Sequence, residues 1–203
     1  MTKSFPLSRK KRMKKLINSC NGGKIMSMTR LMEESEMSRV LERLAAQLHE
    51  RHDRCDSVML IGIERRGVHI ARRLAQRLKD RLGETVDLGT LDINLYRDDW
   101  TRLAGKPRIG QSHIPQSVND RTIVLVDDVL YTGRTIRAAL EALLDYGRPQ
   151  AVELLVLIDR GHRELPIQPD YVGRVMHTSR QEHVDVLLKE HDGEDAVLLR
   201  GAS

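Results

Sequence analysis

Aromatic residues and cysteines are scarce in this chain, and long apolar runs are lacking. Aromatic side chains make up 3% of the 203 residues, so the core must be built from aliphatic side chains. No apolar run approaches the roughly 20 residues that span a bilayer, which predicts no membrane segment. The two cysteines, Cys20 and Cys55, form no CxxC pair and offer no disulfide framework. We therefore expect reduced thiols in a cytoplasmic protein.

Basic residues are concentrated at the amino-terminal end. The formal net charge is +5, yet residues 1–26 contain eight Lys and Arg and no acidic residue, so the rest of the chain is net acidic. We interpret residues 1–30 as a basic extension. It is a disordered tail, a segment before an internal start at Met26 or Met28, or an RNA-binding arm. It lacks the apolar stretch of a secretory signal. Residues 31–203 have the length of one domain.

Helical and strand-like patterns alternate along the chain. Helical spacing runs from Met37 to before Asp53, over residues 71–83 and over residues 136–144. Short apolar runs at 57–63, 122–126 and 152–158 indicate buried strands. Residues 86–96 alternate as in a half-buried strand, and short strands are expected at 183–188 and 196–199. This order predicts an α/β fold with a mainly parallel, twisted sheet flanked by helices.

Residues 97–116 are rich in Gly, Pro and charge and have no periodicity. A connection of that length inside a compact domain is usually functional or disordered. A flexible cover over an active site is one physical reason to keep it. Its cations are candidates to face a ligand, although loop charges are usually solvated. They are Arg97, Arg102, Lys106 and Arg108.

Two adjacent carboxylates mark the most informative segment, residues 124–135. Asp127 and Asp128 follow apolar strand residues, and a turn containing Gly133 then opens a helix. Such a turn can direct N–H groups and hydroxyls at a phosphate. The carboxylates would repel that phosphate, so they need vicinal ribose hydroxyls or a hard cation such as Mg²⁺. A simple helix cap needs only one such residue, and neither GxxxxGK[ST] nor GxGxxG occurs. The pattern predicts a sugar phosphate ligand.

Residues 124–135 resemble the phosphoribosyl pyrophosphate motif of type I phosphoribosyltransferases. Residues 91–99, 159–166 and 170–173 are similar to further signatures of the PyrR family, the bifunctional pyrimidine operon attenuators and uracil phosphoribosyltransferases. The resemblance covers roughly residues 37–200. It implies a type I phosphoribosyltransferase fold with a small hood, and a cytoplasmic, Mg²⁺-dependent homodimer or higher homo-oligomer. The implied reaction converts uracil and phosphoribosyl pyrophosphate to UMP and pyrophosphate.

The same resemblance implies the roles of individual residues. Asp127 and Asp128 would hold the ribose hydroxyls and the metal, and with Arg97 they form the catalytic set. Residues 62–67 match the loop that grips pyrophosphate, although Arg65 stands where the family usually has Thr. That departure either strengthens anion binding or distorts a tight turn. The implied substrate contacts are Arg65, Arg66, Gly67, Val129, Leu130, Tyr131, Thr132, Gly133, Arg134, Thr135, Arg160 and Val184.

The family's second function is UMP-responsive binding of a stem-loop in pyrimidine-operon mRNA. Glu42 and Ala46 stand where the family typically has Thr and His, so one would repel phosphate and the other has no polar group. We therefore expect the enzyme to outweigh the regulator. Two alternatives stay open: an RNA-binding attenuator, or a phosphoribosyltransferase for another base such as orotate or a purine. The remaining RNA-binding candidates are Arg43, Arg51, His162 and Arg163.

Overall fold

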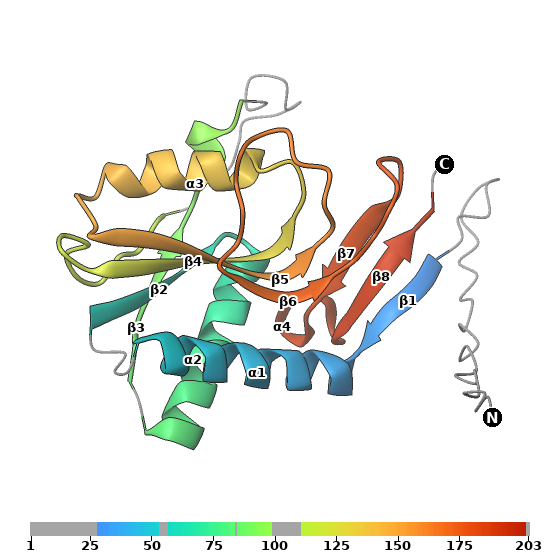
Figure 1. The fold of residues 1–203 in the computed structure, drawn as a ribbon, viewed down its shortest axis with the longest axis horizontal. Helices are drawn as coiled ribbons and strands as arrows, with labels where there is room; N and C mark the ends of the chain where they lie inside the picture. Colours follow the sequence, from blue (N-terminus) through green and yellow to red (C-terminus); the bar gives the residue numbers. More distant parts are fainter. Residues whose placement is uncertain (1–27, 53–56, 84, 99–110, 202–203) are drawn as a thin grey trace, which may run out of the picture.

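A computed structural model describes residues 28–52, 57–83, 85–98 and 111–201. It contains two β-sheets (Figure 1). The larger sheet has five parallel strands in the order β3-β2-β4-β5-β6. These strands are β2 (Val58–Ile63), β3 (Asp87–Leu91), β4 (Thr122–Leu130), β5 (Ala151–Asp159) and β6 (Tyr171–Val175). The longer helices are α1 (Glu34–His52), α2 (Arg66–Leu82) and α3 (Arg134–Leu144). The predicted fold class is confirmed.

Helices cover both faces of this sheet, with α1 and α2 on one face and α3 on the other (Figure 1). Successive strand residues alternate between the two sides. Leu60 and Val124 belong to the core cluster under α1 and α2, whereas Ile61 and Leu125 belong to the cluster under α3. Both clusters are largely aliphatic. The uninterrupted apolar runs of β2 and β4 are therefore explained by burial on both faces.

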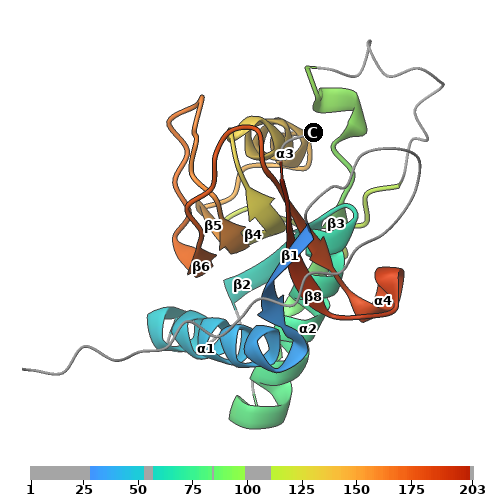
Figure 2. The same cartoon turned by 90° about the vertical axis from the view of Figure 1, so that its right-hand side faces the viewer.

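A smaller antiparallel sheet forms the hood, which faces the viewer in Figure 2. Its order is β1-β8-β7, built from β1 (Met28–Glu33), β7 (His183–Leu187) and β8 (Ala196–Arg200). The short helix α4 (Lys189–Asp192) lies between β7 and β8. The first and last strands are thus neighbours, with Met28 opposite Arg200.

The structure departs from the sequence expectations at two strand ends. The strand expected over 86–96 ends at Leu91, because the Asp92 carboxylate accepts the Asn94 N–H at 2.8 Å and a single turn of 3-10 helix follows, η2 (Asn94–Tyr96). Leu95 is consequently 53% exposed. β4 in turn continues through both carboxylates to Leu130, since β5 runs beside it that far. β1, β6 and α4 were not expected from the sequence.

Much of the predicted basic extension and of the 97–116 segment lies outside the described residues. Residues 28–30 of the predicted extension belong to β1. Beyond the gap, His113 exchanges two backbone hydrogen bonds with Thr90 of β3, at 2.8 and 2.9 Å. Among the described helices, none is long and apolar enough to cross a membrane.

Candidate active site

The two predicted carboxylates lie at the carboxyl end of β4, beside β2 and β5. Asp127 is buried, with 6% of its surface exposed, and Asp128 is partly buried. The Asp127 side chain accepts the N–H of Asp128, and the Asp128 side chain accepts the N–H of Val129, each at 2.9 Å. Each of these local bonds uses one carboxylate oxygen, Oδ1.

Burial disfavours the ionised form of both carboxylates. Loss of hydration raises the pKa of Asp127 well above its ordinary value, and the charge of Asp128 raises it further. Burial also raises the pKa of Asp128, although its hydrogen bond with Asp127 and the charge of Arg66 act in the opposite direction. A polyol or a cation would supply the hydrogen bonds or charge that the ionised pair lacks. Such perturbed groups are typical of functional sites.

A tight approach brings the loop before α2 against the same strand. A Cβ atom on Gly67 would lie 2.2 Å from the carbonyl oxygen of Val126 and 3.3 Å from the Cα atom of Asp127. Only glycine fits there, so Arg66 and Gly67 sit directly beside the carboxylates. Arg65 is exposed, follows a cis peptide bond from Glu64, and has φ −103° and ψ −43°, which any residue adopts readily.

The predicted phosphate turn follows β4 and ends at the start of α3. Gly133 has φ +93° and no side chain to cap the helix, and the Arg134 N–H donates to Oγ1 of Thr132 at 3.4 Å, a long contact that leaves the amide groups of the first turn largely available. The Thr132 carbonyl accepts the N–H groups of Glu164 and Leu165 at 2.9 and 3.1 Å, which braces the turn from outside. Arg134 differs from the other turn residues, since its guanidinium pairs with Glu164 at 2.8 Å and Asp98 at 2.5 Å. An open helix amino terminus of this kind favours an anion.

Arg160 reaches from the end of β5 toward the hood. It is 5% exposed, its guanidinium lies 4.1 Å from the ring centre of Tyr131, and it donates to Thr178 and to the Ser179 carbonyl at 3.2 and 2.9 Å. Val184 lies on β7, partly buried against the core. Arg160 therefore ties the turn after β4 to the segment before β7. Arg97 directly follows η2 with an extended backbone.

The four RNA-binding candidates fall into two groups. Arg43 and Arg51 lie along α1 beside β6, where Arg43 donates to the carbonyls of Val172 and Gly173, and Arg51 pairs with Glu153 at 2.9 Å. His162 and Arg163 lie after β5. Nε2 of His162 is 2.6 Å from the Thr178 carbonyl oxygen.

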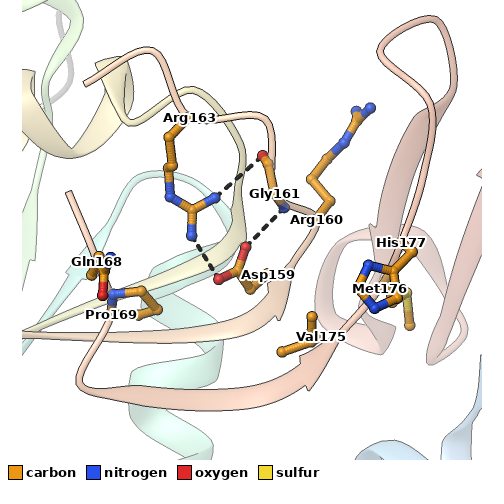
Figure 3. Close-up of a pocket in the computed structure, with 9 residues that line it drawn as sticks. All are labelled: Asp159, Arg160, Gly161, Arg163, Gln168, Pro169, Val175, Met176 and His177. Carbon is orange, nitrogen blue, oxygen red and sulfur yellow. Dashed lines mark hydrogen bonds and ion pairs between the residues drawn. The ribbon is translucent and has the colours of Figure 1, made fainter. Parts of the chain in front are cut away.

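Figure 3 shows Arg163 in the wall of a pocket of about 350 Å³. Its guanidinium binds the Asp159 carboxylate at 2.6 Å and the backbone carbonyls of Tyr131, Gly161 and Ile167 at 3.0 to 3.2 Å. These four contacts give Arg163 a structural role in shaping the loop after β5.

No cluster of three metal-binding side chains is present in the described part of the chain. Two neighbouring carboxylates without further protein ligands suit Mg²⁺, which usually binds one or two carboxylates together with substrate phosphates and water. The donor set therefore fits a metal that arrives with its ligand.

Comparison with known proteins agrees with this geometry. Residues 27–191 match the family model described as the phosphoribosyl transferase domain. Hypoxanthine phosphoribosyltransferases of Trypanosoma cruzi (TM-score 0.63, 15% identity, 86% of this chain and 97% of that one) and Staphylococcus aureus (0.62, 18%, 83% and 89%) share the fold. Fold and site together define a phosphoribosyltransferase.

The curated relatives specify the family. The chain is 52% identical to the bifunctional protein PyrR of Pelotomaculum thermopropionicum over 83% of this chain and 93% of that protein. It is 47% identical to that of Clostridioides difficile over 84% and 96%, and 48% identical to that of Deinococcus radiodurans over 83% and 92%. The chain belongs to the PyrR family.

Proposed function

We propose that this phosphoribosyltransferase transfers the phosphoribosyl group of phosphoribosyl pyrophosphate to uracil, giving UMP and pyrophosphate. The observation that carries the proposal is the placement of three unlike features around one strand end. Asp127 and Asp128 suit the ribose hydroxyls, the amino terminus of α3 after Gly133 suits the 5′-phosphate, and Arg66 suits pyrophosphate. A sugar with phosphates at both ends matches this order of charges. The resemblance of residues 159–166 to the PyrR signature supports uracil as the base.

The reaction leaves electron deficiency on the sugar and negative charge on the departing pyrophosphate. The carboxylates orient the ribose and stabilise its developing positive charge, while Arg66 stabilises the leaving group. Mg²⁺ would be held by Asp127 and Asp128 with oxygens of the donor, and it would neutralise charge on the pyrophosphate. Arg160 and Val184 border the hood side, where the base is expected.

The deciding experiment is product formation from a labelled sugar donor with each nucleobase in turn. Uracil should give UMP with a kcat/KM far above those for orotate, hypoxanthine and guanine. Activity confined to a purine or to orotate would refute the assignment of the base. Omission of Mg²⁺ should abolish transfer, and sedimentation of the same sample tests the predicted homo-oligomer.

We also propose that the chain binds pyrimidine-operon mRNA in response to UMP. Glu42, expected from the sequence to repel phosphate, is paired with Arg81 at 2.7 Å and with Arg77 at 3.5 Å. Its negative charge is therefore largely offset, which weakens the argument against RNA binding. A salt titration with cognate and scrambled stem-loops should compare the full chain with one beginning at Met28. The shorter chain should keep the sequence preference, and the basic extension should add only salt-sensitive affinity. Loss of preference in the shorter chain would contradict this proposal.

A further inference from the structure

The guanidinium of Arg66 is held by the hood. Its Nε lies 3.3 Å from Oδ2 of Asp192, and its Nη2 lies 3.0 and 3.3 Å from the two carboxylate oxygens. Nη1 makes no hydrogen bond within the residues that the structure describes. The planar group is thus fixed through two of its nitrogens, with the third left for a ligand.

The Asp192 side chain is also held by a bond that does not involve Arg66. It is the last residue of α4, and its Oδ2 accepts the N–H of Leu188 at 2.9 Å. Burial alone would raise the pKa of Asp192, but the Leu188 N–H and Arg66 outweigh it, and the net effect is a lowered pKa. The carboxylate is therefore ionised at neutral pH, and the bond from the Leu188 N–H limits its orientation.

A separate and stronger contact, made by Arg73, attaches the hood to α2. Arg73, two helical turns beyond Arg66, binds Glu190 at 2.8 and 2.6 Å and Asp195 at 2.9 and 2.8 Å. Its side chain is 17% exposed, compared with 33% for Arg66. Because Arg73 already joins α2 to the hood, the contact between Asp192 and Arg66 is not needed for that purpose. We infer that this contact instead determines how the Arg66 side chain is oriented.

We propose that Asp192 is a positioning residue that holds the Arg66 guanidinium beside Asp128, ready for the pyrophosphate end of the donor. The inference rests on the proposed function, in which Arg66 binds pyrophosphate. An arginine that is already ordered loses less side-chain entropy when it binds. Asp192 supplies that ordering from outside the substrate site.

The test compares Asp192→Asn with a matched control, Glu190→Gln. The asparagine oxygen can still accept the Leu188 N–H, so α4 keeps its geometry while Arg66 loses its charged partner. Glu190→Gln also removes one negative charge from α4 and weakens an ion pair to α2, but it leaves Arg66 alone. Asp192→Asn should raise the KM for the donor and the Kd of pyrophosphate with Mg²⁺ about threefold to tenfold. The KM for uracil should not change, and the melting temperature should fall by no more than in Glu190→Gln.

A double variant separates positioning from a structural role. In a chain that carries Arg66→Ala, adding Asp192→Asn should change the pyrophosphate Kd no further, because both changes act through one group. An unchanged donor KM in Asp192→Asn would overturn the inference. A lower donor KM would also overturn it, because it would show that Asp192 keeps Arg66 away from the donor. Equal weakening of uracil and donor, with a melting temperature below that of Glu190→Gln, would also overturn it. A wild-type chain without transfer activity would refute the proposed function and the inference together.

Discussion

Replacing both site carboxylates should separate activity from stability. In Asp127→Asn/Asp128→Asn, side-chain volume is kept, and the amide oxygens can still accept the N–H groups of Asp128 and Val129. The ribose hydroxyls and Mg²⁺ that we propose to bind there lose their ionised partners. Removing one preorganised electrostatic contact typically costs about 10²–10³ in kcat, so transfer should fall at least a thousandfold. The unliganded fold should nevertheless become more stable.

The gain follows from the raised pKa values of the pair. A raised pKa means that the folded chain binds protons more tightly than the unfolded chain, so stability falls as pH rises through the folded-state values. At neutral pH the variant escapes this penalty, and we expect about 0.5–2 kcal/mol of added stability. For a chain of this size, each kcal/mol corresponds to about 2–4 °C in Tm. The gain should shrink as pH falls toward the unfolded pKa of an aspartate, about 4.

Thermal melts from pH 4 to 8 and steady-state kinetics on the same protein measure both effects. Asp80→Asn, at an exposed position of α2, controls for loss of one carboxylate outside the site. Activity within tenfold of the parent would refute the role of the pair. A stability gain that is equal at pH 4 and pH 8, or a loss at neutral pH, would refute the electrostatic reasoning.

Three further predictions concern packing and the loop. Gly67→Ala should lower stability by about 3 kcal/mol in urea titrations and abolish transfer, because the Val126 carbonyl occupies the space of the new methyl group; near-parental stability would contradict the close approach. Glu153→Gln should cost about 2 kcal/mol by the same titration, since this buried carboxylate accepts from Arg51, His52 and the Tyr171 hydroxyl; an unchanged midpoint would show that the network adds nothing. Tryptic cleavage within residues 97–116 should slow with a donor analogue and Mg²⁺ if that segment covers the site; equal rates would argue against a cover.

The sequence was sufficient for the central strands of the main sheet and for the residues at the end of β4. Apolar runs and helical periodicity are patterns within short stretches of sequence. For this reason β2, β4, β5 and the three longer helices could be predicted. β6 could not, because Gly173 and Arg174 interrupt its apolar pattern. A Cβ on Gly173 would lie 2.3 Å from the Leu157 carbonyl oxygen, so this signature glycine serves close packing between strands. β1 likewise depends on pairing with β8, far away in the sequence.

The site was predicted in part for the same reason. Asp127, Asp128 and the turn at Gly133 are close in sequence, so their pattern was visible there. The contact of Arg66 with Asp192 joins residues 126 positions apart, and no local signal marks it. The compensation of Glu42 by Arg81 also depends on how α1 packs on α2. Charges considered singly mislead wherever a partner comes from another element.

The pairing of β1 with β8 fixes the order in which a growing chain can become active. β1 leaves the ribosome among the first described residues, yet its partner strand is synthesised last. At about 5–20 residues per second, β1 waits on the order of ten seconds or more for β8. The five-stranded sheet, with both carboxylates, can assemble during that interval, while Arg66 still lacks Asp192. A chain that stops short of β8 would therefore hold Asp127 and Asp128 in the larger sheet while β1 and β7 both lack the strand with which they pair.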